Sequence, residues 1–256
     1  MIEIINLCKK FNSHIVLDNL SLNIPEGQTT VIIGRSGVGK SVLLKHIIGI
    51  MEPDSGQVFV DNQDISKLTG KALVKFRMKF GMLFQGAALF DSLTIGENVG
   101  FALLQHTNMP RSQIFERVKE CLEMVGLKGV EGLKPAELSG GMKKRVGLAR
   151  AICTKPQIIL YDEPTTGVDP IMGDAVNELI MELHDKLKVT SIAVTHDMIS
   201  AYKIATNIAM LYEGKIIAEG APGEIKNAKD PIVHQFVTGT AVGPITQKDG
   251  TVFRKL

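Results

Sequence analysis

The feature that most constrains this chain is a glycine-rich segment, GRSGVGKS, at residues 34–41. It completes the pattern G-x-x-x-x-G-K-[ST], in which backbone amides at a helix N-terminus surround phosphate groups. A β-branched run at residues 29–33 precedes it and an apolar stretch at 40–49 follows it, so the strand–loop–helix context is present. The segment therefore predicts a nucleoside triphosphate site at the end of a buried strand.

Individual residues of this loop have distinct expected roles. Its glycines let the backbone approach the phosphates closely, because glycine lacks a side chain. Lys40 supplies a point charge for the β- and γ-phosphates, and Ser41 places a hydroxyl group on Mg²⁺. The residues expected to contact the nucleotide are Gly34, Arg35, Ser36, Gly37, Val38, Gly39, Lys40, Ser41 and Val42.

A second segment, IILYDEP at residues 158–164, ends a buried strand with two acids. Such acids lie at the carboxyl edge of an α/β sheet, where ligands bind. We expect Asp162 to hold Mg²⁺, often through water, and Glu163 to orient and deprotonate the attacking water. An acid that caps the next helix is the alternative interpretation, and the phosphate loop favours the metal role.

Three further motifs fit the same site. Gln85 and His196 each follow a strand-like run, so a Gln amide could contact Mg²⁺ or the water and a His could donate to a γ-phosphate oxygen. Alone, either residue is usually structural. Ser139, Gly140 and Gly141 open a predicted helix and expose backbone donors for an anion, although the motif alone predicts only a cap.

Composition narrows the class of protein. The chain has 256 residues, of which 22% are charged, and its net charge is +2, which argues against a nucleic-acid-binding protein. The basic run Lys143, Lys144 and Arg145 is interpreted as solvated surface. Three widely spaced cysteines without a C-x-x-C pair are expected to be reduced thiols in a cytosolic protein. No stretch of about 18 apolar residues occurs, so the chain is not expected to span a bilayer by itself.

Apolar periodicity outlines the organisation of the chain. A mostly helical insertion is expected from about residue 86 to 155, and the tail from residue 239 is expected to be disordered or ordered by a partner. The pattern predicts strands at 2–7, 15–24, 29–33, 81–84, 157–161, 191–195, 208–212 and 215–218, a hairpin near 56–61, and helices at 40–49, 71–79, 95–104, 112–125, 142–152 and 171–187.

In this order, GRSGVGKS, Gln85, LSGGM, IILYDEP, GVDP at 167–170 and His196 resemble the nucleotide-binding subunits of ABC (ATP-binding cassette) transporters. The resemblance covers residues 2–236. It implies an ATPase with ATP and Mg²⁺, and an α/β P-loop NTPase cassette. The expected parts are a mixed central sheet, an N-terminal antiparallel β subdomain and an inserted α-helical subdomain. The cassette would span residues 1–236, with a C-terminal extension at 237–256.

The resemblance also implies that two copies pack head to tail. Ser139, Gly140 and Gly141 of one copy would contact the γ-phosphate held by the other, and Asp169 would lie in a loop that crosses the interface. Phe11 fits the aromatic residue that stacks on adenine, although it could equally be core. Met142 stands where the family usually has glutamine, and a thioether cannot replace the hydrogen bonds of an amide.

A narrower resemblance concerns the cargo. The runs FQGAALFDSLTIGENVGFAL, PAELSGGMKKRVGLARAI and YDEPTTGVDPI are similar to the ATPases of Mla/Mce phospholipid transport systems. This implies an integral membrane permease, a lipid-binding Mce-domain protein, and a peripheral location on the cytoplasmic face of the inner membrane. The segment around residues 85–101 is expected to dock the permease, and the tail to pack on the partner ATPase or permease.

Three other functions stay open at this point. The chain could serve a transporter for another solute, act as a soluble ABC ATPase in repair or translation, or bind ATP without cleaving it. A single cassette without a long coiled-coil insertion favours transport. The presence of Asp162, Glu163 and His196 favours hydrolysis.

Overall fold

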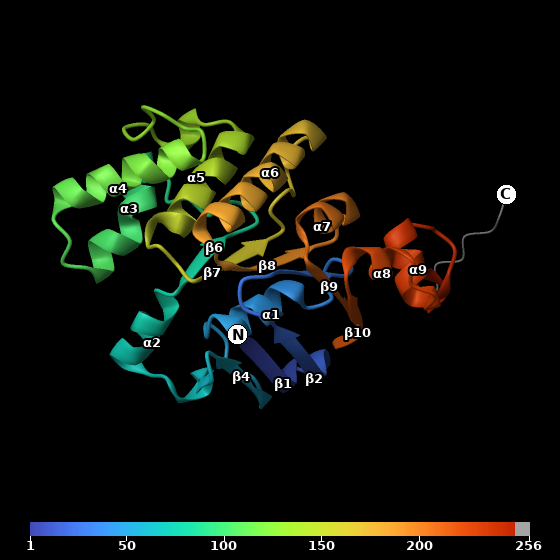
Figure 1. Ribbon diagram of the computed structural model, residues 1–256. Coiled ribbons are helices and arrows are strands. Elements are labelled where there is room, and N and C mark those ends of the chain that lie inside the picture. Colours follow the sequence, from blue (N-terminus) through green and yellow to red (C-terminus); the bar gives the residue numbers. More distant parts are fainter. Residues whose placement is uncertain (249–256) are drawn as a thin grey trace.

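The centre of the molecule is a six-stranded mixed sheet, seen in a computed structural model that describes residues 1–248 (Figure 1). The strand order is β10-β9-β3-β8-β7-β6, and every neighbouring pair is parallel except β10 and β9. The strands are β3 (Thr29–Ile33), β6 (Phe80–Leu83), β7 (Ile158–Asp162), β8 (Thr190–Thr195), β9 (Asn207–Tyr212) and β10 (Lys215–Gly220).

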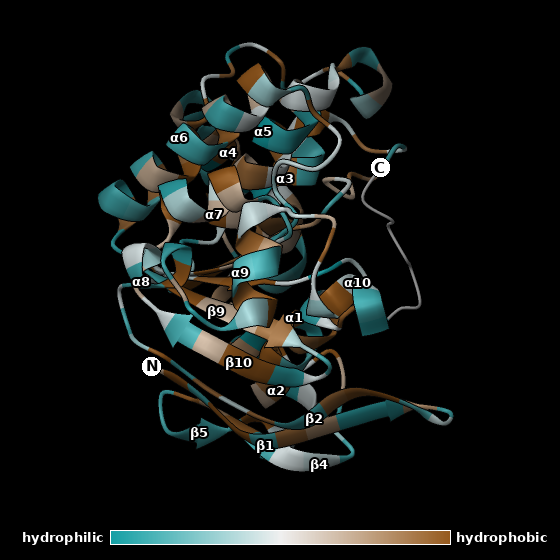
Figure 2. Cartoon of the chain, turned by 90° about the vertical axis from the view of Figure 1, so that its right-hand side faces the viewer, coloured by the Kyte–Doolittle hydropathy of each residue, from teal (hydrophilic) through white to brown (hydrophobic). Residues whose placement is uncertain are grey.

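A second sheet is antiparallel and has the order β2-β1-β4-β5. Figure 2 shows this sheet as a layer of its own beneath the rest of the chain. Its strands are β1 (Ile2–Phe11), β2 (His14–Ile24), β4 (Ser55–Val60) and β5 (Gln63–Asp64).

Strand β3 joins two hydrophobic cores because successive side chains of a strand point to opposite faces. Val31 and Ile33 belong to the core beneath the helices that cover the upper face of the central sheet. Ile32 belongs to the core shared with the antiparallel sheet and with helix α1 (Lys40–Ile47). All three side chains are fully buried, which contributes about 1.5–3 kcal/mol each. The loop that follows β3 is therefore anchored on both sides.

The helices fall into groups around these cores. Figure 1 shows α3, α4 and α5 together as a lobe beside β6, while α6 and α7 cover the neighbouring strands. The helices are α2 (Gly70–Arg77), α3 (Ile95–His106), α4 (Arg111–Met124), α5 (Gly140–Cys153), α6 (Pro170–Leu187), α7 (Met198–Ile204), α8 (Pro222–Lys226), α9 (Pro231–Thr238) and α10 (Pro244–Lys248), with 3₁₀ turns at Ile65–Lys67 and Pro135–Glu137.

The predicted mixed sheet, antiparallel subdomain and helical insertion are all confirmed. The tail differs from its prediction over residues 239–248, because helix α10 folds back onto α9 of the same chain. Gln235 Oε1 accepts a hydrogen bond from the Ile245 amide at 2.8 Å, and its Nε2 donates to the Thr240 carbonyl at 3.2 Å. Residues 249–256 of the predicted tail lie outside the described residues.

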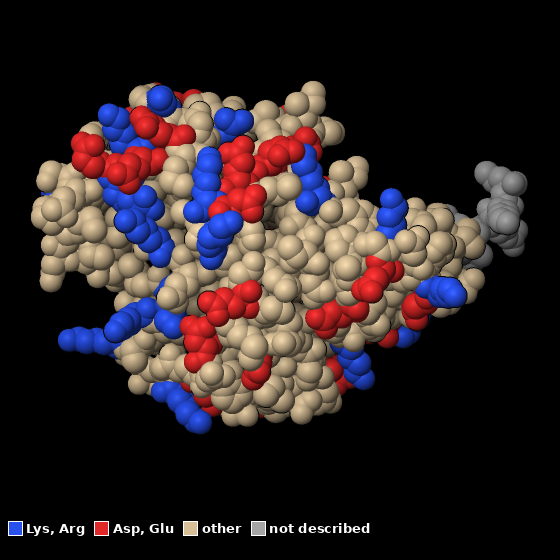
Figure 3. All heavy atoms as spheres, viewed as in Figure 1, with Lys and Arg blue, Asp and Glu red and all other residues tan. Residues whose placement is uncertain are grey.

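The surface charge is mixed. On the face shown in Figure 3, basic and acidic side chains are interspersed over both the helical lobe and the sheets. Within residues 1–248, no helix has the length and apolar character needed to cross a bilayer.

Candidate functional site

The glycine loop lies between β3 and α1, and two of its glycines are required by geometry. Gly34 has φ +155°, and a Cβ there would collide with the main-chain oxygen of Leu211 on β9. Gly39, the N-cap of α1, has φ +112°, and a Cβ there would lie 2.8 Å from Val16 Cγ1. Both backbone conformations are unfavourable for residues with side chains. The loop can therefore pass closely between β2 and β9.

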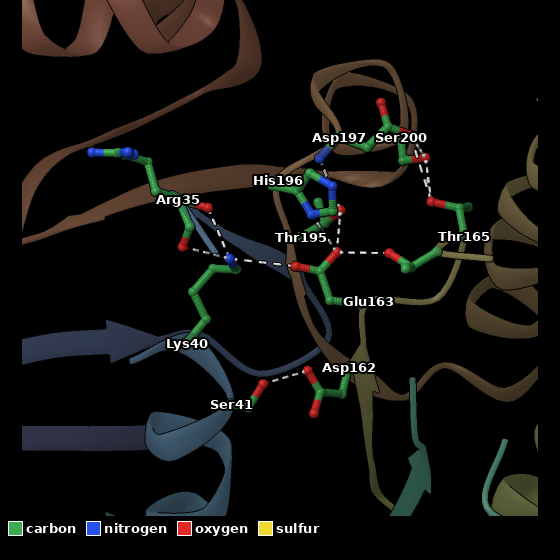
Figure 4. Close-up of polar contacts among 12 residues, drawn as sticks. Arg35, Lys40, Ser41, Asp162, Glu163, Thr165, Thr195, His196, Asp197 and Ser200 are labelled. Atoms are coloured by element: carbon green, nitrogen blue, oxygen red, sulfur yellow. Dashed lines mark hydrogen bonds and ion pairs between the residues drawn. The ribbon is translucent and has the colours of Figure 1, made fainter. Parts of the chain in front are cut away.

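Lys40 is a buried cation at this loop, with only 5% of the residue exposed. Its Nζ donates to the main-chain oxygens of Gly34 at 2.8 Å and Arg35 at 3.1 Å, and lies 3.3 Å from Glu163 Oε1 (Figure 4). Burial lowers the pKa of Lys40, while the nearby Glu163 carboxylate opposes this change. Phosphate oxygens are natural competitors for such an ammonium group.

Asp162 and Ser41 bring two oxygen donors together. Ser41, in the first turn of α1, donates its hydroxyl to Asp162 Oδ1 at the end of β7, with an O–O distance of 2.7 Å (Figure 4). Mg²⁺ takes oxygen ligands and is usually held by one or two protein groups together with substrate phosphates. The donor set therefore fits Mg²⁺ next to the glycine loop.

Glu163 follows directly and receives hydrogen bonds from three residues. Its Oε2 lies 2.9 Å from His196 Nδ1, 3.1 Å from Thr166 Oγ1 and 3.3 Å from Thr195 Oγ1. A carboxylate only accepts hydrogen bonds, so His196 Nδ1 carries the proton in this contact. Only 8% of Glu163 is exposed. Its backbone is left-handed, with φ +50°, a strain that is typical of functional sites.

The protonation of Glu163 follows from these neighbours. Burial alone would raise the pKa of its carboxyl group, but the hydrogen bond from His196 and the charge of Lys40 outweigh that effect. The pKa consequently lies below its usual value. Glu163 is ionised at neutral pH and can receive a proton.

A cleft of about 350 Å³ opens over these groups. Phe11 lies on its wall with 42% of the residue exposed, so the interpretation of Phe11 as core is wrong. An exposed ring at this place can stack on a base. The predicted residues that line the cleft are Phe11, Ser36, Gly37, Gly39, Lys40, Ser41, Val42, Gln85, Glu163 and His196.

Comparison with known proteins identifies the family. The profile of the ABC transporter family matches residues 17–166, more than half of the chain. The chain belongs to the ABC transporter family. It is an ATP-hydrolysing subunit of such a transporter.

Several relatives match this ABC ATPase over nearly its full length. The intermembrane phospholipid transport system ATP-binding protein MlaF of Haemophilus influenzae is 41% identical over 248 residues, which cover 97% of this chain and 94% of the relative. The probable ribonucleotide transport ATP-binding protein mkl of Mycobacterium leprae is 40% identical, with 95% and 70% covered. The chloroplastic protein TRIGALACTOSYLDIACYLGLYCEROL 3 of Arabidopsis thaliana is 40% identical, with 96% and 75% covered.

Solved structures have the same fold. The dimeric ATP-binding cassette MJ0796 bound to ADP and Pi superimposes with a TM-score of 0.80 at 34% identity, covering 87% of this chain and 99% of that one. The cbiO1 protein of Clostridium perfringens, part of the ABC transporter complex cbiONQ, gives a TM-score of 0.81 at 30% identity, with 91% and 93% covered.

Two of the predicted loop residues of this ABC ATPase face away from the cleft. The Arg35 side chain points away from Glu163 in Figure 4, and only its main-chain oxygen contacts Lys40. Val38 is partly buried against the core that the two sheets share. Neither residue lines the cleft, and contact of Arg35 and Val38 with the nucleotide stays a prediction.

The LSGGM segment at residues 138–142 lies outside the cleft of its own chain. Ser139 caps α5, because its Oγ accepts a hydrogen bond from the Met142 amide at 3.2 Å. Asp169 caps α6, because its Oδ1 accepts hydrogen bonds from the amides of Ile171 and Met172 at 3.1 and 3.0 Å. A Cβ on Gly141 would lie 2.6 Å from Met172 Cε, so the two helix starts adjoin. Contact of Ser139, Gly140, Gly141 and Asp169 with a second copy stays a prediction.

Met142 has a structural explanation. Its side chain is partly buried against the upper core, so a thioether suits this position better than an amide.

The interpretation of Lys144 as solvated surface is wrong. Only 5% of Lys144 is exposed, and its Nζ donates to the main-chain oxygens of Gln85 and, at 3.4 Å, Glu163. No sequence signal indicated this burial, which comes from the packing of α5 against the segment that contains Gln85. Thr166 and Thr195, which donate to Glu163, were also missed, and no sequence signal distinguished them.

Proposed function

We propose that this ABC ATPase drives phospholipid transport as a dimer on the cytoplasmic face of the inner membrane. Its partners would be an integral permease and an Mce-domain lipid-binding protein. The observation that carries the proposal is the match to MlaF of Haemophilus influenzae, because it spans 97% of this chain and 94% of the relative. The similarity thus includes the segments outside residues 17–166, which the general family profile matches.

In the proposed reaction, Glu163 accepts a proton from the attacking water. Lys40 exchanges its contact with Glu163 Oε1, now 3.3 Å long, for the β- and γ-phosphate oxygens of ATP. His196 holds Glu163 through the proton on Nδ1, and donation toward the γ-phosphate would use a second proton on Nε2. Gln85 would contact the water or the metal. Ser41 and Asp162 would hold Mg²⁺, which neutralises charge on the phosphates.

Closure of two copies would complete each site. Ser139, Gly140 and Gly141 of one copy would face the nucleotide bound at Lys40 of the other, and Asp169 would cross the interface. The dimeric arrangement of the MJ0796 cassette supports this proposal. ATP can close the dimer only to the extent that it binds the closed form more tightly than the open form.

The permease would dock near the segment at residues 85–101. This segment begins at the cleft with Gln85 and enters the helical lobe through α3. Phe90 is 46% exposed and its ring packs against Phe101 at a centroid distance of 4.9 Å. An exposed aromatic ring packed beside the partly buried Phe101 of α3 suits an anchor in a protein–protein contact.

Reconstitution tests the cargo. The chain would be tagged, purified from membranes with its partners, and placed in phospholipid vesicles. We expect ATP-dependent transfer of labelled phospholipid, lost in a Lys40→Ala complex because the buried ammonium is removed. The name of the Mycobacterium leprae relative makes a ribonucleotide the control cargo. Ribonucleotide transport without lipid transfer would contradict the proposal.

A further inference from the structure

One face of α5 holds the segment that contains Gln85. Lys144, Gly147 and Arg150 are spaced by three residues and lie along this face. Lys144 Nζ donates to the Gln85 carbonyl. A Cβ on Gly147 would lie 2.7 Å from Leu83 Cδ1, so the helix and the end of β6 are in close contact.

The backbone after Gln85 is bent toward these cations. Ala87 and Ala88 are left-handed, with φ +61° and +47°, which residues with side chains rarely adopt. Arg150 donates through Nη1 to the Ala88 carbonyl at 2.7 Å and through Nη2 to the Ala87 carbonyl. The main-chain carbonyls at positions 85, 87 and 88 thus all accept hydrogen bonds from side chains of α5.

Lys144 differs from Arg150 because it also contacts the main chain of Glu163. Its Nζ lies 3.4 Å from the main-chain oxygen of Glu163, just beyond β7. The ammonium is therefore shared between the backbones of two residues whose side chains line the cleft.

Removal of this ammonium would leave the carbonyls of Gln85 and Glu163 without their side-chain donor. We therefore expect a stability cost as well, so the test of a catalytic role has to measure turnover and ATP binding in folded protein. Burial lowers the pKa of Lys144, and the charges of Glu163 and Asp162 oppose the change.

We propose that Lys144 is a positioning residue for ATP hydrolysis, which fixes the spacing between Gln85 and Glu163 through their main-chain carbonyls. This inference rests on the proposed roles of Gln85 and Glu163. A small displacement of a reacting group can slow catalysis by about 100-fold, so the spacing matters for kcat. Binding of ATP depends on the loop at Lys40, which Lys144 does not contact.

Lys144→Met tests the inference in steady-state hydrolysis. We expect kcat to fall at least about tenfold while the Kd for ATP stays within about twofold. Lys144→Arg should restore most of the rate, since a guanidinium can reach two carbonyls. Lys143→Met is the matched control and should keep the wild-type kcat, because Lys143 is half-exposed and has no hydrogen bond to Gln85 or Glu163.

A double-mutant cycle separates positioning from a general structural effect. In the Glu163→Gln background, Lys144→Met should cause a smaller loss of single-turnover hydrolysis than it does in the wild type, because the part of its effect that acts through Glu163 is already gone. An additive loss would overturn the inference. Should Lys144→Met not fold, Lys144→Gln, whose short amide reaches one carbonyl, takes its place in the cycle.

The same experiment separates this inference from the proposed function. Wild-type kcat in Lys144→Met, together with an inactive Glu163→Gln, would refute the role of Lys144 alone. Wild-type kcat in Glu163→Gln would instead refute the proposed base, and the role of Lys144 with it.

Discussion

The carboxyl group of Glu163 makes more polar side-chain contacts than the other groups described in the cleft. One oxygen lies near the buried Lys40 ammonium, and the other receives the hydrogen bond from His196. These contacts depress its pKa against the opposing effect of burial. The stability that they contribute is present above the ordinary pKa of a glutamate and is lost as the pH falls through the lower folded value.

Removal of the His196 imidazole should raise the pKa of Glu163. The hydrogen bond from His196 is the largest effect that holds this pKa down, so without it burial acts with less opposition. Titration of the Glu163 side-chain carboxyl by ¹³C NMR in the His196→Ala protein measures the change. His234→Ala, on α9, is the matched control. An identical midpoint in all three proteins would contradict the assigned contact.

Residues of the site could be predicted from the sequence where a motif determines the position of each side chain. Lys40 and Ser41 are fixed by the loop pattern, while Asp162 and His196 are placed at strand ends by the buried runs before them. Lys144 could not be found in this way. Its burial arises only when α5 packs against the segment after Gln85, a contact far apart in sequence.

At the scale of elements, the N-termini of α5 and α6 form the surface that is proposed to face a second copy. Helix α6 begins after Asp169, whose Oδ1 accepts hydrogen bonds from two main-chain amides. These amides would otherwise lack partners within the helix. The Asp169 side chain therefore has a structural role besides any contact with a second copy.

Asp169→Ala should lower the free energy of unfolding by about 1 kcal/mol, because the N-cap acceptor is lost. Asp169→Asn keeps an oxygen at the cap and should stay within a few tenths of a kcal/mol. Urea denaturation monitored by circular dichroism gives both values. Equal stability of the Ala protein and the wild type would show that the cap contributes nothing measurable.

Buried strands of the central sheet were predictable, and short helices were not. Strand β3 is a continuous β-branched run and β8 is a run of apolar or β-branched residues except for Ser191, and both were placed within one residue of their observed bounds. Helices α7 and α8 have seven and five residues, too few to display a helical period. Helix α10 was missed because Gln235, ten residues before Ile245, supplies the contact that orders it.

At the scale of the whole molecule, the proposed dimer requires the N-terminus of α5 to approach the nucleotide of a second copy. Gly140 tests this without disturbing the single chain, because a Cβ there meets no atom within 4 Å. An aspartate at this position would set a negative charge against the γ-phosphate of the other copy.

Gly140→Asp should therefore abolish ATP-dependent dimerisation while leaving ATP binding to the monomer unchanged. Sedimentation with Mg-ATP, in a Glu163→Gln background that slows turnover, measures the dimer. Gly223→Asp on α8 is the matched control, since a Cβ there also meets no atom within 4 Å. A dimer of wild-type affinity in Gly140→Asp would rule out the head-to-tail arrangement.

In the proposed mechanism, one edge of the central sheet both binds ATP and supplies the base that cleaves it. Measurement of ATP affinity and of hydrolysis side by side in Glu163→Gln separates these two roles. We expect kcat to fall by at least about 100-fold, the contribution of a general base. The affinity should be equal or tighter, because Lys40 loses its competing carboxylate. Turnover at the wild-type rate would contradict the account.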